Sequence, residues 1–291
     1  SGLPVKVLVL DTQVYSNTGG QACTSGFVGQ ISDMAPVGAD WSGKREPRKE
    51  IGLLGMAHRN TFVLQGAVSH VSHLLEGFIH GLNRRGPALF NVYSVCPVEH
   101  GVPDGSARER SRLAVESRAY PLLRYDPDAG ETVRECLSLA GNPAPADDWP
   151  AVHLEHPDAP GAPLALRLTF ADFAAGEARF RKHYTPVPQD ADPGSLVPVA
   201  EYLDLEPAAR EGRLPCVWLT DPQGRALERR VVSAEVIAAS GERRAFWRQL
   251  RSLTGADLRV DPEAIAARVR EDMATRLAGS LLALADAGYR P

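Results

Sequence analysis

The apolar run Val5–Leu10 is the feature that most constrains the fold of this chain. Apart from Lys6 it is wholly β-branched or aliphatic, and Asp11 and Thr12 follow it directly. A strand with one solvent face alternates apolar and polar residues, whereas a strand covered on both faces is continuously apolar. The run therefore predicts a central strand of a parallel sheet. Ligands bind beyond the carboxyl ends of such strands, so we expect chemistry in the following loop, DTQVYSNTGGQ.

Further strands and helices alternate after this loop. Residues 61–65 and 88–95 are predicted strands, and apolar residues at helical spacing predict a helix at 67–82 between them. A strand–helix–strand order favours right-handed crossovers and a parallel sheet. A helix at 108–117 and a last edge strand at 120–125 follow. The predicted fold class is α/β, a parallel sheet with flanking helices.

Proline content divides the chain. Residues 141–222 hold 13 of its 23 prolines. Because proline lacks a backbone N–H, we expect 141–213 to form a wrapping linker, interrupted by one helix at 170–183. Residues 1–140 would then be the first domain and 214–291 a smaller α+β unit. The elements expected in that unit are a β-hairpin at 214–220 and 227–233 and helices at 242–253 and 262–287.

Composition excludes two classes of partner. The chain has 32 basic and 36 acidic residues, a formal net charge of −4, with arginines spread among acids, which argues against nucleic acid. Its apolar stretches fall short of the roughly 20 residues that span a bilayer, so we expect no membrane partner. The 4 cysteines include no CxxC pair, and we expect reduced thiols and a cytoplasmic location.

The loop after the first strand suits a diphosphate bound through a divalent metal. Mg²⁺ takes oxygen ligands from hydroxyls and carbonyls, and Thr12 and its neighbours supply them. Gly19 and Gly20 allow backbone N–H groups to approach phosphate oxygens closely. On spacing alone, a glycine-rich turn that binds nothing is equally compatible with these residues.

The string VLVLDTQVYSNTGGQ closely resembles the thiamine-diphosphate-binding segment of the single-chain pyruvate:ferredoxin (flavodoxin) oxidoreductases. Other stretches agree with that family in order and approximate spacing. They are Arg48–Gly52, similar to KKDLG; Arg85–Leu89, Tyr93–Cys96 and His100–Gly101, similar to PGPSL…YAxCxxxHG; and 114–116 with 123–127, similar to AVE…LYRYDP. The resemblance covers about residues 3–128 and implies a thiamine-diphosphate-binding fold.

The resemblance also implies roles for individual residues. The Thr12 hydroxyl and the Val14 carbonyl would ligate Mg²⁺, and Asn17 would be the catalytic residue beside the reactive thiazolium carbon. The rest of the cofactor loop would be Thr18, Gly19 and Gly20. Cys96 would ligate a [4Fe–4S] cluster, as cysteines commonly do. His100 is a candidate for hydrogen bonding on the substrate or cluster side.

Departures from the family pattern limit what the chain would do alone. It lacks the family's Gly-Asp-Gly upstream of Asn17, and Cys23-Thr24-Ser25 replaces the common Ser-Lys-Ala-Thr. The other three cluster cysteines and the carboxylate that activates the cofactor would come from elsewhere. We therefore expect a carboxy-terminal portion of a larger enzyme, inactive by itself. Its implied partners are the remaining oxidoreductase domains, ferredoxin or flavodoxin, a 2-oxoacid, coenzyme A and a second copy in a homodimer.

Alternative interpretations remain at this stage. A non-redox thiamine-diphosphate lyase or synthase would keep the loop but need no cluster, and a degenerate structural subunit would bind neither. His70, His73 and His80 on the predicted 67–82 helix have no third ligand at a usual spacing, so a packed or solvated histidine face is favoured over a metal site.

Overall fold

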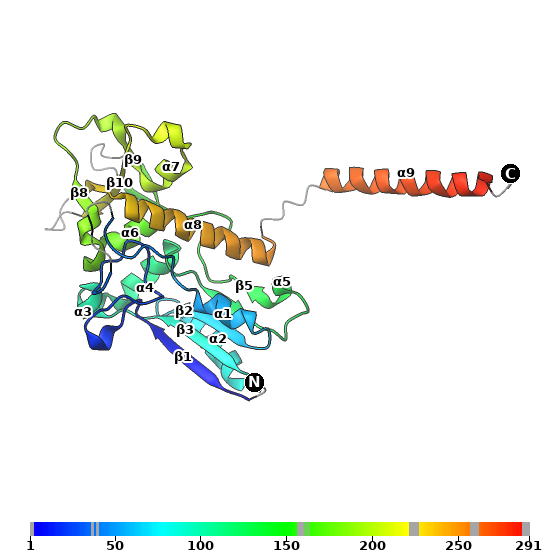
Figure 1. The fold of residues 1–291 in the computed structure, drawn as a ribbon, viewed down its shortest axis with the longest axis horizontal. Coiled ribbons are helices and arrows are strands. Elements are labelled where there is room, and N and C mark those ends of the chain that lie inside the picture. The colour runs from blue at the N-terminus through cyan, green and yellow to red at the C-terminus, as the bar shows by residue number, and fades with distance from the viewer. Residues whose placement is uncertain are drawn as a thin grey trace. The chain divides into compact units, whose positions relative to one another are not determined.

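A mixed five-stranded sheet underlies the first half of the chain (Figure 1). Its order is β1-β3-β2-β4-β5; the first three strands are parallel and the last two join antiparallel. The bounds are β1 Lys6–Asp11, β2 Phe62–Ala67, β3 Ala88–Tyr93, β4 Leu123–Tyr125 and β5 Leu137–Ser138. The α/β prediction is confirmed, but the sheet is only partly parallel. The reason is that β4 enters opposite Gln65, at the carboxyl end of β2, and runs back.

The computed structural model describes residues 3–35, 38, 41–155, 161, 163–220, 227–256 and 262–286. Residues 1–254 form one compact unit and residues 255–291 another. In the described part of the chain, no helix combines the length and apolar character needed to cross a membrane. Residues 221–225, where the sequence DPQGR predicts the turn of the expected hairpin, lie outside the described residues.

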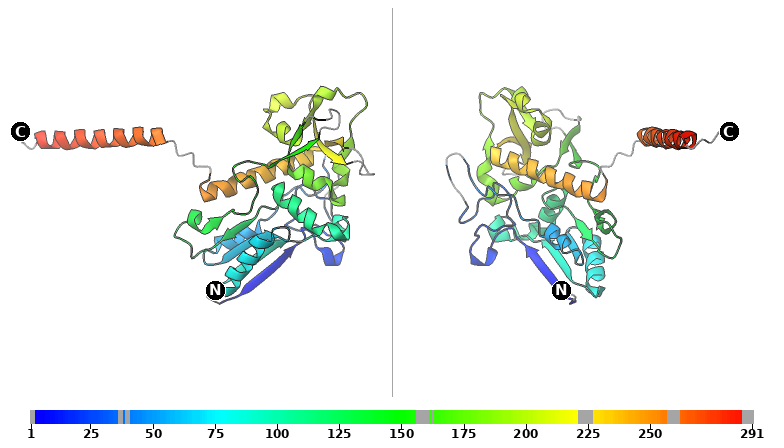
Figure 2. Two further views of the ribbon diagram at one scale, coloured as in Figure 1. Left: turned by 180° about the vertical axis from the view of Figure 1, so that it is seen from behind. Right: turned by 45° about the vertical axis from the view of Figure 1, so that its right-hand side comes forward.

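β1 is an edge strand, not the central strand that its sequence predicts (Figure 2). Val5, Val7, Leu8 and Leu10 are 45–63% exposed. The prediction was wrong because an apolar sequence indicates only that both faces of a strand are suited to burial. It does not show that other parts of the same chain cover those faces.

Helices cover the two faces of β2 and β3. On one face Gly55 of α1 (Ile51–Ala57) lies against Val63 and Leu89. On the other face Gly77 and Gly81 of α2 (Val71–Asn83) lie against the sheet residues Leu64, Phe62 and Phe90. Adjacent strand residues point to opposite faces, which places the two helices on opposite sides. The predicted helix at 67–82 begins only at Val71 because β2 continues to Ala67.

The second half of the first unit adds two smaller sheets and further helices. Phe170, Phe173 and Phe180, from within the proline-rich stretch, pack in the main core with Phe27. The helix expected at 170–183 is an α-helix followed by a 3-10 helix, and the hairpin of β10 and β11 is confirmed as antiparallel. The remaining elements of this unit are α3 Pro97–His100, α4 Ala107–Glu116, α5 Val133–Cys136, β6 Ala151–Glu155, β7 Pro163–Arg167, α6 Phe170–Ala175, η3 Ala178–His183, β8 Tyr184–Pro186, β9 Leu196–Pro198, α7 Val199–Asp204, β10 Leu214–Thr220, β11 Leu227–Val232 and α8 Ala234–Thr254, with 3-10 turns at Ser16–Thr18 (η1), Asp104–Ser106 (η2), Pro193–Ser195 (η4) and Pro207–Arg210 (η5).

The described part of the second unit forms α9 (Pro262–Asp286), which agrees with the helix predicted at 262–287. Its described large apolar side chains are 50–67% exposed.

Candidate functional site

The loop after β1 closes into a tight turn. The 3-10 turn Ser16–Thr18 ends at Gly19, where φ is 104°, and φ of Gly20 is 90°. The Gly20 N–H donates to the Tyr15 carbonyl at 3.1 Å. A Cβ on Gly20 would collide with the Glu99 carboxylate. Glycine is therefore favoured at both positions, since other residues disfavour this φ, and a side chain at position 20 would also require Glu99 to move.

The two oxygens that the resemblance assigns to Mg²⁺ are neighbours. The Thr12 hydroxyl donates to the Val14 carbonyl at 2.9 Å and accepts from the Ser16 hydroxyl at 2.8 Å. Adjacent ligands of an octahedral Mg²⁺ with bonds of about 2.1 Å are about 3 Å apart. The Thr12–Val14 pair therefore fits two adjacent positions of a Mg²⁺ shell.

A cavity of about 440 Å³ adjoins this turn. Val14, Gly19, Gly20, Glu99 and Arg179 line it, together with residues 30–35. Asn17 and Thr18 are exposed and are not among its lining residues. The structure thus brings three of the six predicted cofactor residues to one cavity and leaves Asn17 and Thr18 on the accessible part of the turn. Thr12, the sixth, is half-buried and bonds Val14 but does not line the cavity.

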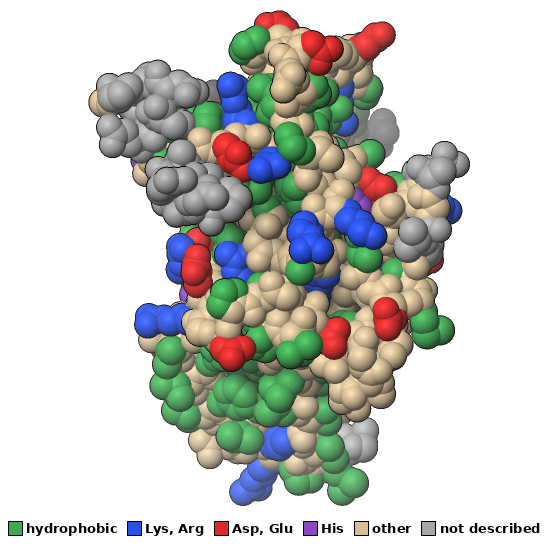
Figure 3. Space-filling view, turned by 90° about the vertical axis from the view of Figure 1, so that its left-hand side faces the viewer, with side chains coloured by type: hydrophobic (Ala, Val, Ile, Leu, Met, Phe, Trp, Pro, Cys, Tyr) green, Lys and Arg blue, Asp and Glu red, His purple; other side chains and the backbone are tan. Residues whose placement is uncertain are grey.

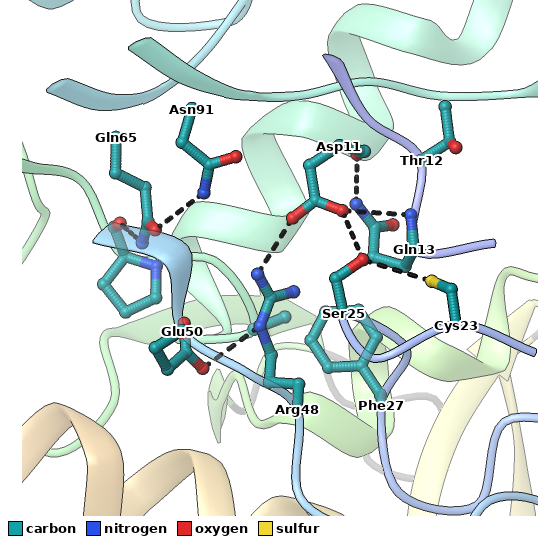
Figure 4. Close-up of polar contacts among 12 residues, drawn as sticks. Asp11, Thr12, Gln13, Cys23, Ser25, Phe27, Arg48, Glu50, Gln65 and Asn91 are labelled. Carbon is teal, nitrogen blue, oxygen red and sulfur yellow. Dashed lines mark hydrogen bonds and ion pairs between the residues drawn. The ribbon is translucent and has the colours of Figure 1, made fainter. Parts of the chain in front are cut away.

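Asp11 at the end of β1 belongs to a buried charge network (Figure 4). Its carboxylate accepts from the Ser25 hydroxyl at 2.8 Å and from Arg48 Nη2 at 2.9 Å. Arg48 Nε lies 3.1 Å from Glu50 Oε1, which also accepts from Arg243 of α8 at 2.7 Å. Burial by itself would lower the pKa of Arg48, but Glu50 and Asp11 together raise it. Asp11 therefore fixes the loop to the rest of the unit.

The network also explains two stretches singled out from the sequence. Arg48 and Glu50 are two of the three charged residues of the segment similar to KKDLG. Ser25, in the divergent 23–25 stretch, bonds Asp11, and Cys23 Sγ lies 3.3 Å from the Ser25 hydroxyl. The departure at 23–25 therefore contributes to holding the loop.

His100 is fully buried beneath the same loop. Its Nε2 lies 2.8 Å from the Thr12 carbonyl, so Nε2 carries the hydrogen and donates it. Burial, with the nearby Arg179 charge, lowers the pKa of His100 to about 4, and the ring is neutral at pH 7. His100 thus holds the backbone of a predicted metal ligand and is not a lining residue of the cavity.

Arg179 and Glu177 are site residues that sequence reasoning missed. Arg179 donates to Glu177 at 2.7 Å, to Gln13 Oε1 at 3.2 Å and to Gln30 Oε1 at 3.3 Å. Glu177 also accepts from the Tyr93 hydroxyl at 3.2 Å. The available signal was an acid and a base two positions apart in the string FADFAAGEARF, whose only other charged residue is Asp172.

Cys96 lies between β3 and α3, where it is half-buried and has a free thiol. Among the residues that the structure describes, no group of three or more His, Cys, Asp or Glu side chains is arranged to hold a metal ion. Cys96 therefore does not belong to such a group within the described residues.

The sequence of this chain is similar to those of known pyruvate oxidoreductases. It is 35% identical over 133 residues to pyruvate:ferredoxin oxidoreductase from Moorella thermoacetica and 36% identical over 140 residues to pyruvate-flavodoxin oxidoreductase from Trichormus variabilis. These matches cover 45% and 48% of this chain and 11% of each relative. The chain is related to these pyruvate oxidoreductases.

The similarity extends further in some relatives. Pyruvate-flavodoxin oxidoreductase from Klebsiella pneumoniae is 33% identical over 196 residues, 66% of this chain and 14% of that protein. No family model matches the chain. It spans about a tenth of the length of the first two relatives.

Proposed function

We propose that residues 1–140 are the thiamine-diphosphate-binding portion of a 2-oxoacid:ferredoxin or flavodoxin oxidoreductase, with pyruvate as the expected 2-oxoacid. The reaction would be oxidative decarboxylation to acyl-coenzyme A, with electrons leaving through [4Fe–4S] clusters. The observation that carries the proposal is the pairing of the Thr12 hydroxyl with the Val14 carbonyl beside the glycine-lined cavity. The relation to pyruvate oxidoreductases supports it.

Each residue of the loop has a defined part in this proposal. Thr12 and Val14 would hold Mg²⁺, and Gly19 and Gly20, which line the cavity without side chains, would leave room for the diphosphate. Asn17 and Thr18 would border the cofactor, and Arg179, held by its ion pair with Glu177, lines the cavity opposite in charge to Glu99. When bound, thiamine diphosphate supplies the carbon nucleophile and the electron sink for decarboxylation. The residues of this chain bind and orient it, while His100 and Asp11 keep the loop in position.

Cys96 supplies one ligand to a [4Fe–4S] cluster in the proposal. The remaining ligands, the coenzyme A and ferredoxin or flavodoxin sites and the second copy of a cytoplasmic homodimer belong to the whole oxidoreductase. Cys96 also separates this function from a non-redox thiamine-diphosphate enzyme, which needs no iron.

The test uses the intact oxidoreductase that carries these residues, purified without oxygen. Thr12→Ala should weaken calorimetric Mg²⁺–thiamine diphosphate binding at least about tenfold because one metal ligand is lost. Cys96→Ser should lower the iron content because one cluster ligand is lost. Thr220→Ala and Cys216→Ala, both on β10, are the matched controls and should change neither quantity. Unchanged affinity in Thr12→Ala contradicts the cofactor assignment, and unchanged iron in Cys96→Ser contradicts the cluster assignment.

A further inference from the structure

An apolar surface follows β1 and the neighbouring side of α2. Its members are large aliphatic side chains, each 45–63% exposed: Val5, Val7, Leu8, Leu10, Val71, Leu75, Ile79 and Leu82. Figure 3 shows hydrophobic side chains gathered at the lower end of the molecule, the end at which β1 lies in Figure 1. Contiguous apolar surface of this kind marks an interaction site.

The orientation of α2 places its apolar stripe on the β1 side of the sheet. The opposite side of the helix faces β4: Glu76 lies 3.6 Å from Arg124, and His80 lies 3.0 Å from Asp126. Leu75 and Ile79 therefore point toward β1. Leu8 is paired with Phe90, which contacts α2, so Leu8 lies on the α2 face of the sheet.

The other face of β1 is also apolar and open. Val7 is paired with Leu89, which contacts Gly55 of α1. Val5, Val7 and Leu54 line a cavity of about 440 Å³ on this face. Both faces of β1 thus lie beside helices that leave the strand itself uncovered.

The free edge of β1 is ready for another strand. The Val5 and Asp11 carbonyls accept from β3 and Ser94 at 2.9 and 3.0 Å, so the odd-numbered residues bond toward β3. The backbone groups of Leu8 and Leu10 consequently face outward. Lys6, the one charged side chain that could guard this edge, turns back to the Arg84 and Gly86 carbonyls at 2.6 and 2.8 Å.

The spacing of strands and helices favours one occupant. Strands are about 4.8 Å apart and packed helices about 10 Å. The helix α2 lies over β2 and β3. A second helix packed against the apolar side of α2 would therefore have its axis about 3 Å beyond β1, above the gap between β1 and one added strand. A second copy paired edge to edge at β1 would instead leave the two α2 helices about 19 Å apart, with β1 still uncovered.

We propose that β1 and the apolar side of α2 dock a strand–helix segment of the oxidoreductase polypeptide that is not part of residues 1–291. Its strand extends the sheet at β1, and its helix lies over β1 against Leu75 and Ile79. This inference rests on the proposed function, which makes these residues part of a longer enzyme. The relatives, of which the chain spans about a tenth, contain ample sequence for such a segment.

Hydrogen exchange without thiamine diphosphate tests the docking separately from cofactor binding. In residues 1–291 alone, the Leu8 and Leu10 amides should exchange at least about a hundredfold faster than the Val7 and Val9 amides. In the intact oxidoreductase all four should be protected. Rapid exchange of Leu8 and Leu10 in the intact protein would overturn the proposal, as would their protection in a homodimer of the isolated chain.

Variants and crosslinks identify the occupant. Leu75→Glu and Ile79→Glu should increase Leu8 and Leu10 exchange in the intact protein at least tenfold, while the melting temperature of residues 1–291 stays unchanged. Val133→Glu, at an exposed apolar position on α5, should do neither. Crosslinks from Leu75→Cys should reach peptides outside residues 1–291. Crosslinks only to a second copy, distinguished by isotope mixing, would refute the proposal.

Discussion

The end of β1 and its body differ sharply in how they are covered. Asp11 is 4% exposed and is bonded by side chains from distant parts of the sequence, whereas Leu8, three residues earlier, is 53% exposed. The loop that would carry the chemistry is thus held in place by buried charged side chains within residues 1–254. These residues leave the apolar strand leading into that loop without a cover among the described residues. The site can therefore be positioned locally even where the sheet ends.

The largest expected effect comes from breaking the buried end. Arg48→Met would leave Asp11 and Glu50 buried without their shared partner, which costs about 3–5 kcal/mol of unfolding free energy. Urea denaturation of residues 1–291 measures this loss. Arg112→Met is the control because Arg112 pairs with Glu116 at the surface, where such a pair is worth about 1 kcal/mol or less. Equal losses in the two variants would show that the Asp11 network is solvated.

The second effect is a pH dependence from His100. Its folded pKa of about 4 lies below the ordinary 6.5, so the unfolded chain binds the proton more readily. The associated stability, about 3 kcal/mol, is complete above pH 6.5 and is lost as the pH falls toward 4. His100→Gln retains an N–H donor for the Thr12 carbonyl and should remove this part of the slope.

Difference measurements isolate His100 from other titrating groups. His73 also has a pKa lowered by burial to about 4, whereas burial raises the pKa of Asp172 to about 6 and acts in the opposite direction. Both remain in the variant and cancel when its denaturation curves are subtracted from those of the unaltered chain. His58→Gln, at an exposed position, is the control. A slope between pH 6.5 and 4 that is the same in all three proteins would contradict the buried neutral ring.

Local pattern predicted much of the fold and part of the site. The periodicity of α2 and the apolar runs of β2 and β3 were sufficient because these elements cover one another within residues 62–93. The edge position of β1 was not predictable, since its neighbours are set by the whole sheet. Arg179 was missed for a similar reason: it reaches Gln13 across 166 residues of sequence, and its own segment gives no sign of that contact.

The smallest expected effect concerns the open body of β1. Leu8→Thr should change the unfolding free energy of residues 1–291 by about 0.5 kcal/mol or less, because the side chain is already exposed and threonine favours strands. The matched Leu64→Thr, on the fully buried β2, should cost about 2–5 kcal/mol. Similar costs at the two positions would mean that β1 is covered in the isolated chain. Repeating the measurement at several protein concentrations would then reveal whether a second copy provides that cover, because only an intermolecular contact makes the cost concentration-dependent.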